Sequence, residues 1–218
     1  MLRYYLSAIG IATAIVAALN AIFASSLGFS PWLLILLTVA FVLFAFLVDG
    51  VIACLARVLP KKLFEPDRKR FAVSDREKRL YDRLKIKSWK VKIPETGALL
   101  KIFDKTKIEN SEDPAYLHTF LRETCYAEIM HEYSAPLAFL ILFAAPGALK
   151  WTIALPVAVV NFILQTFPIA VQRYNRNRLT KIYRVRLKKA ENAAAGNVAL
   201  TPAASAKRDV PGEDSSAE

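Results

Sequence analysis

The sequence lacks the features that mark several common protein classes. It has only two cysteines, Cys54 and Cys125, and their separation is not the spacing of a metal site. It contains no internal repeat and no run of residues that predicts a β-strand. These absences argue against repeat arrays and cysteine-based metal sites, and they leave helices as the expected structure.

Acidic residues are also scarce. The 30 Lys and Arg side chains outnumber the 19 Asp and Glu, which gives a net charge of +11, and no acid lies within residues 173–189. Even so, 55% of the residues are hydrophobic. A hydrophobic chain with strongly basic connecting segments is typical of a membrane protein.

Four long stretches without charge predict the membrane spans, since a span needs about 20 mostly apolar residues. The second stretch resumes past Asp49 to Ala56, and the third contains Pro136 and Pro146, so the third is either a full span or a re-entrant segment. We therefore expect an all-α integral membrane protein with about four transmembrane helices and a cytoplasmic helical insertion. The four stretches are residues 4–29, 30–48, 133–149 and 151–172.

The first apolar stretch has two interpretations. It follows Arg3 and ends near Ser25 and Ser26, which resembles a cleaved signal peptide. A second apolar stretch begins only a few residues later, however. This proximity favours a transmembrane helical hairpin formed by residues 1–56.

The positions of the basic residues predict the orientation in the membrane. Fifteen lie within residues 57–101 and eight within 173–189, whereas the connection 25–30 has no charge. The positive-inside rule therefore places both termini and the segment 57–113 in the cytoplasm of a multi-pass protein. Both cysteines then lie in, or face, a reducing compartment, so we expect no disulfide.

Two helix starts can be recognised from their capping residues. Ser74 is the predicted N-cap of a short helix, with Glu77 as its capping-box partner. Asp113 and Pro114 suit the cap and the first position of a longer helix, because proline needs no hydrogen-bond acceptor there.

These signals divide the chain after the first hairpin into three parts. The last part is rich in Ala, Ser, Pro and charge, without apolar periodicity, and is predicted to be a disordered tail. The parts are a basic cytoplasmic segment (57–113), a segment with a motif-bearing helix, a membrane hairpin and a basic juxtamembrane helix (114–189), and the tail (190–218).

Polar residues interrupt the apolar face of the helix that begins at Pro114. At about 100° per residue, Glu128 and His131 fall in the middle of this face and can touch each other, while Glu123 lies at its edge. A buried carboxylate beside an imidazole has shifted pKa values suited to proton transfer. The pair is either catalytic or a structural hydrogen bond. A metal site is disfavoured, because a di-iron bundle needs a second Glu-x-x-His and the chain has none.

A second polar stripe runs along the last apolar stretch. Asn161, Gln165 and Gln172 recur at spacings that place them, with Pro168 and Asn175, on one helical face. Amides facing lipid would be unsatisfied, so this face should look into the bundle and either hold helices together or form a site. The sequence "QRYNRNRL" follows, and its arginines suit either anionic lipid headgroups or ligand phosphates.

Two motifs in this order resemble those of a known family. "RETCYAEIMH" and "QRYNRNRL", preceded by "KSWKVKIPETG" and "FDKTKI", are similar to the glycosyl-4,4'-diaponeurosporenoate acyltransferase family over about half of the chain, residues 81–189. Its members are small bacterial membrane proteins that esterify a glycosylated carotenoid with a fatty acid. The resemblance implies an acyltransferase of carotenoid biosynthesis in a bacterial cell membrane.

The resemblance extends to individual positions. Glu132 and Asn177 depart from the family pattern, which has Trp and Pro there, and these departures bear on the substrate more than on the chemistry. The matching positions are Trp89 and Pro94 upstream, then Glu123, Thr124, Ala127, Glu128 and His131 in the first motif, and Gln172, Arg173, Tyr174, Asn175, Arg176 and Arg178 in the second.

The resulting hypothesis is a membrane acyltransferase that moves a fatty acyl group from an acyl thioester, such as acyl-CoA, to a hydroxyl of a hydrophobic glycolipid or glycosylated carotenoid. His131 would be the general base, and Glu128 or Glu123 would hold its tautomer. No metal, no other cofactor and no nucleic acid is expected. Donor and substrate would be bound by Trp89, Gln172, Arg173, Tyr174, Asn175, Arg176 and Arg178.

The alternative is a non-enzymatic membrane protein that binds lipid or assists assembly. Its basic segments would recognise anionic headgroups or a partner enzyme, which explains the charge of residues 57–101 equally well. This alternative gives no reason for burying Glu128 and His131.

Overall fold

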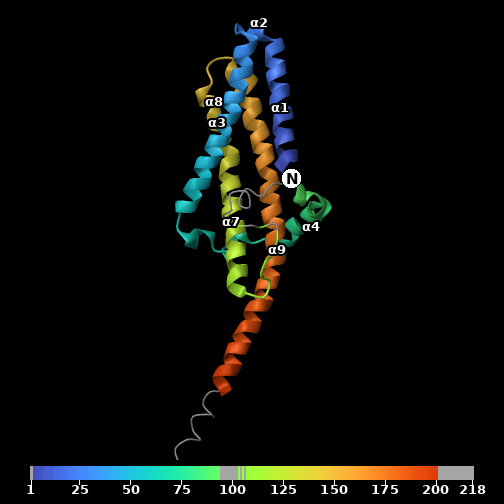
Figure 1. The fold of residues 1–218 in the computed structure, drawn as a ribbon, viewed down its shortest axis with the longest axis vertical. Coiled ribbons are helices and arrows are strands. Elements are labelled where there is room, and N and C mark those ends of the chain that lie inside the picture. Colours follow the sequence, from blue (N-terminus) through green and yellow to red (C-terminus); the bar gives the residue numbers. More distant parts are fainter. Residues whose placement is uncertain (1, 94–102, 104, 106, 201–218) are drawn as a thin grey trace, which may run out of the picture.

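The computed structural model describes residues 2–93, 103, 105 and 107–200, and within them it contains helices and no strand (Figure 1). The prediction of an all-α protein is therefore confirmed. The α-helices are α1 (Leu2–Ile22), α2 (Ala24–Leu27), α3 (Pro31–Val58), α4 (Asp75–Arg83), α5 (Ile86–Trp89), α7 (Pro114–Leu137), α8 (Ile141–Ala144) and α9 (Leu155–Leu200). The shorter turns are the 3-10 helices η1 (Lys61–Phe64), η2 (Lys69–Phe71), η3 (Lys90–Lys92) and η4 (Ala138–Leu140), and the π-helical turn η5 (Lys150–Ala154).

The first two long helices, α1 and α3, run side by side and are joined at one end by α2 (Figure 1). The chain reverses at Gly28, which has a positive φ of 72° that glycine adopts without strain. Ser30 then caps α3 by accepting a hydrogen bond from the backbone N–H of Leu33, with Pro31 at the first helical position. The result is a helical hairpin.

The surface of this hairpin is apolar. Large side chains along α3, including Leu36, Leu43 and Leu47, are exposed. Only 17% of the most apolar 18-residue stretch of α3 is buried within the protein. A core helix of a soluble protein would bury most of these side chains, whereas a helix in lipid exposes them. The hairpin therefore has the surface of a membrane-embedded element.

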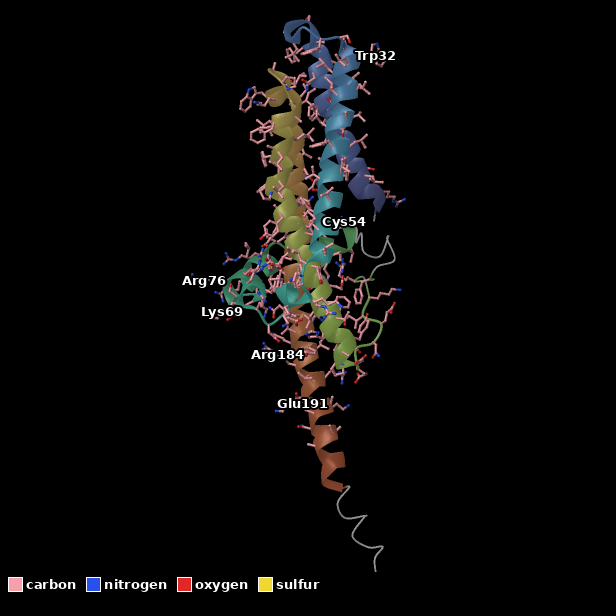
Figure 2. All side chains as sticks on the ribbon, turned by 90° about the vertical axis from the view of Figure 1, so that its left-hand side faces the viewer. Trp32, Cys54, Lys69, Arg76, Arg184 and Glu191 are labelled. Carbon is pink, nitrogen blue, oxygen red and sulfur yellow. The ribbon has the colours of Figure 1, made fainter. Side chains whose placement is uncertain are left out.

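Among the described residues, two helices are long and apolar enough to cross a membrane, namely Pro31–Val58 and Lys150–Gly196, and the apolar part of α1 is shorter (Leu6–Ile22). Figure 2 shows Trp32 near one end of the molecule and the charged residues Lys69, Arg76 and Arg184 in its other half. This distribution supports membrane association. The number of four spans and the cytoplasmic position of both termini stay predictions.

The third apolar stretch forms a broken helix. α7 continues through Pro136 to Leu137 and is followed by η4 and α8. The chain then reverses at Gly147, whose φ is 52°, and η5 leads it into α9. Residues 133–149 are thus helical up to Ala144 and end in a turn, and their side chains pack against α3 and η5.

The segment after α3 wraps around the polar half of α7. Phe64 and Phe71 are fully buried against α7, and the Phe64 ring stacks on Tyr126 with 3.7 Å between ring centroids. Ser74 caps α4 as predicted, because its hydroxyl accepts from the Glu77 backbone N–H. Asp113 likewise caps α7 through Ala115. Pro94 lies outside the described residues.

α9 continues to Leu200, past the predicted start of the tail at residue 190. The residues after Lys189 include several alanines, and alanine has the highest helix propensity of all residues. A helix can therefore continue past residue 190 although that segment has no apolar periodicity. Residues 201–218 lie outside the described part of the chain.

Candidate functional site

Two groups of interacting polar side chains lie next to each other along α7. The first is centred on Glu128, which has no exposed surface. Its carboxylate forms ion pairs with Arg173 and Arg176 of α9, and each N···O distance is 2.5 Å. A buried carboxylate between two guanidinium groups is stabilised in its ionised form, because unpaired burial of the charge would be far more costly.

The two arginines are held by further partners. Arg173 also pairs with the Glu77 carboxylate of α4 and donates to the backbone oxygen of Ala72 at 3.1 Å. Arg173 holds the pKa of Glu77 below its ordinary value of 4.5. The contacts of this arginine therefore tie α4, α7 and α9 together.

Arg176 is 2% exposed. Its Nε donates to the Thr124 hydroxyl at 3.1 Å and its Nη1 to the Phe71 backbone oxygen at 3.2 Å. Gln172, one turn earlier, is buried as well. Arg173 and Arg176 both donate to protein acceptors, and their predicted role in binding donor phosphates stays a prediction.

Glu123 forms a separate pair. Its two carboxylate oxygens accept from Arg57 of α3 at 2.8 and 2.7 Å, in the bidentate geometry that favours arginine. Arg57 also lies over the Tyr126 ring, 4.7 Å from its centroid. Glu123 therefore joins α3 to α7 and is directed to Arg57, not to His131.

The second group is centred on His131, which is partly buried. Its Nδ1 lies 2.5 Å from the side-chain oxygen of Gln165 on α9, and the Gln165 nitrogen donates to Asp49 of α3 at 2.7 Å. The predicted contact between Glu128 and His131 is not made. Residues three apart differ by about 60° around the helix, and Arg173 and Arg176 hold the Glu128 side chain on its own side. An amide, not a carboxylate, holds the imidazole.

When Asp49 is ionised, this chain of hydrogen bonds determines the histidine tautomer. A carboxylate only accepts, so the Gln165 nitrogen points to Asp49 and the Gln165 oxygen points to His131. The oxygen accepts, so His131 Nδ1 must carry the proton. Nε2 is then left with its lone pair, which is the form of imidazole that can take a proton from a hydroxyl group.

An apolar groove reaches the same polar chain. It lies between α1, α3 and α9 and is lined mostly by aliphatic side chains, together with Asp49 and Asn161. Asn161 lies one turn before Gln165 and 3.5 Å from Asp49. The groove has room for a hydrocarbon chain, and a polar group at the end of that chain would lie near Asp49.

The remaining predicted residues gather on another face of α9. Lys90 donates to Asn175 at 2.6 Å and lies over the Tyr174 ring, 5.2 Å from its centroid. The Trp89 indole N–H donates to the Leu84 backbone oxygen at 2.9 Å. Arg178 is exposed and lines a cleft beside these residues. The structure therefore separates the predicted site into one group around Glu128 and His131 and a second, partly exposed group beside α4 and α5.

Asp49 is the residue that the predicted site did not contain. Its position as an acid inside an apolar stretch was visible in the sequence, and so was the inward stripe with Asn161 and Gln165. Only the fold brings them to His131. Glu132, by contrast, is a partly exposed partner of Arg70. Within the described residues, no group of three His, Cys, Asp or Glu side chains is arranged to hold a metal ion.

Comparison with known proteins gives one result. A family model described as glycosyl-4,4'-diaponeurosporenoate acyltransferase matches residues 60–185. No curated protein and no solved structure matches the chain. The matched region contains Glu128, His131, Gln165, Arg173 and Arg176, whereas Asp49 lies before it.

Proposed function

Because the chain belongs to the glycosyl-4,4'-diaponeurosporenoate acyltransferase family, whose name describes acyl transfer in carotenoid biosynthesis, we propose that it moves a fatty acyl group from an acyl thioester to a hydroxyl of a membrane acceptor. The acceptor would be a glycosylated carotenoid or a glycolipid of similar shape. The observation that supports this function is the hydrogen-bond chain from Asp49 through Gln165 to His131.

In the proposed reaction, His131 Nε2 takes the proton of the acceptor hydroxyl as its oxygen attacks the thioester carbonyl carbon. The carbon–oxygen ester bond forms and the carbon–sulfur bond breaks. The proton then passes from the imidazolium to the departing thiolate. While the ring is charged, Gln165 keeps its oxygen on Nδ1–H, and Asp49 fixes the orientation of the amide.

The apolar groove supports a membrane acceptor or acyl chain. Its aliphatic lining would hold hydrocarbon, and Asp49 and Asn161 would border the end at which the hydroxyl or the thioester reacts. The site would lie at the cytoplasmic side of a bacterial cell membrane, where soluble acyl thioesters are available, if both termini are cytoplasmic as the basic segments predict.

The network around Glu128 has a different task in this proposal. Since Arg173 and Arg176 are engaged with Glu77, Glu128 and backbone oxygens, we assign them to positioning α7 against α9 and α4. This contact fixes where His131 and Gln165 meet. Acyl-CoA stays the proposed donor, with its phosphates bound elsewhere.

The test is an acyl-transfer assay on the purified full chain with a labelled acyl thioester and membrane lipid extract as the acceptor. We expect His131→Ala to lose transfer by about 10²-fold or more, the usual contribution of a general base, while its thermal unfolding stays near that of the wild type. Full activity of a folded His131→Ala variant would exclude the assigned base. If the wild-type chain transferred no acyl group from any thioester, the lipid-binding alternative would be favoured instead.

A further inference from the structure

A basic cleft lies outside the buried network, between α4, α5, η3 and α9. Its volume is about 440 Å³, and the described residues that line it include five cationic side chains from four elements. Asp82 is the one acidic residue among these described lining residues. The cations are Lys78 of α4, Lys87 of α5, Lys90 of η3, and Arg178 and Lys181 of α9.

The turn that brings these charges together has an unfavourable backbone conformation. Lys85 has a positive φ of 50°, a conformation that non-glycine residues rarely adopt, and it turns the chain between α4 and α5. Ile86 then packs fully buried with Tyr81 and Val171. This turn directs Lys87 and Lys90 back toward α9 and toward Arg178.

The cations in the cleft repel one another. Burial, and next the charges of Arg178 and Lys87, lower the pKa of Lys90 from its ordinary value. Lys90 keeps neutral partners, the Asn175 oxygen and the Tyr174 ring. An anion bound between Lys87, Lys90 and Arg178 would relieve this repulsion, and phosphate oxygens suit both amine and guanidinium donors.

The cleft lies at the level where the apolar helices begin. η3 contacts α1, whose N-terminal end lies beside α4 in Figure 1. Leu80, Leu84 and Val91 around the cleft expose apolar side chains at the same level. Basic residues beside exposed apolar ones are the usual composition of a membrane surface contact.

From this geometry we propose that the cleft between α4, α5, η3 and α9 binds a phosphate group at the membrane surface. Two molecules supply that chemistry there: an anionic phospholipid and the nucleotide part of coenzyme A. Binding of a phospholipid in this cleft does not depend on the proposed acyl transfer. Binding of coenzyme A rests on that proposed function. On an ideal helix, Tyr174 and Arg178 face away from Gln165, so the cleft is separate from the histidine chain.

The experiment measures binding to the purified full chain in non-ionic detergent by microscale thermophoresis. The phosphate ligands are dioctanoyl phosphatidylglycerol and coenzyme A, and their phosphate-free controls are dioctanoylglycerol and pantetheine. The cleft variant is Lys87→Gln/Arg178→Gln. The matched control is Arg76→Gln/Arg79→Gln, which removes the same charge from exposed positions of α4 outside the cleft lining.

We expect the cleft variant to weaken binding about 30-fold, from about 1 kcal/mol for each cation removed, and the control to weaken it by less than about threefold. Selective loss with phosphatidylglycerol identifies a lipid headgroup, and selective loss with coenzyme A identifies the donor. Equal weakening by both double variants, or no change in either, would overturn the proposal. If the cleft variant does not fold, Lys181→Gln replaces it, with an expected loss of about fivefold.

His131→Ala separates this proposal from the proposed function. The variant lacks the proposed base, yet it should bind both phosphate ligands as tightly as the wild type. Loss of phosphate binding in His131→Ala would mean that the cleft is not an independent site. Loss of transfer with binding retained is the result that we expect.

Discussion

The surroundings of Glu128 and His131 differ, although the two residues are one turn apart on α7. Glu128 is completely buried and lies between two arginines, so its charge is matched by permanent charges. His131 contacts a neutral amide, and the nearest acid in its chain, Asp49, lies behind that amide. Matched permanent charges hold helices together, whereas a titratable ring with a neutral partner stays free to exchange a proton.

The largest expected effect comes from removing the charge of Glu128. In Glu128→Gln, the buried guanidinium group of Arg176 loses its counter-charge and Arg173 keeps only Glu77, which should lower the free energy of unfolding by about 3–5 kcal/mol. The matched control is Glu123→Gln, whose partner Arg57 is 41% exposed, and it should cost about 1 kcal/mol or less. Thermal unfolding in detergent measures both variants. Equal losses would show that the burial of the Glu128 network adds nothing to its strength.

A second expected effect concerns the histidine chain. Gln165→Leu should lower kcat about 10²-fold and leave KM nearly unchanged, because the imidazole loses the acceptor that fixes its tautomer. Steady-state transfer kinetics measure the change. Thr166→Val is the control, since the exposed Thr166 follows Gln165 on α9 and its hydroxyl donates to the Ile163 backbone oxygen. If Thr166→Val reduces kcat as much as Gln165→Leu, then Gln165 does not act by orienting the imidazole ring.

The smallest expected effect is a pH dependence of stability in the ion-pair network around Glu128, which includes Glu77. Arg173 lowers the pKa of Glu77, so the stabilisation by Glu77 is complete above its unfolded pKa of about 4.5 and is lost as pH falls through the lower folded value. Between pH 7 and pH 3, the wild type should lose about 1 kcal/mol more stability than Glu77→Gln. Unfolding midpoints at both pH values test this. Parallel pH profiles for the two proteins would contradict it.

The sequence predicted the helices better than it predicted the side-chain contacts between them. The caps at Ser74 and Asp113 depend on neighbouring residues, so they were recognisable without the fold. The burial of Glu128 followed from helical periodicity, which is also local. Features that depend on a few consecutive residues were therefore predictable.

The pairing of the polar residues was not predictable in the same way. Glu128 could meet either His131 on its own helix or the arginines 45 and 48 positions later, and only the packing of α7 on α9 selects the arginines. Asp49 and Gln165 are 116 residues apart, and the hydrogen bond between them joins a region outside the family match to one inside it. No periodic pattern contains that information.

The length of α9 has a consequence for handling the protein. Its 46 residues extend about 69 Å, more than twice the roughly 30 Å thickness of the hydrocarbon layer. Figure 1 shows its last turns extending alone beyond the other helices. An isolated helical end opens readily, so a protease added to the intact protein should cut within this projecting end, near Glu191, while the packed helices stay intact. The trimmed chain would keep every contact made by Asp49, Glu128, His131 and Gln165.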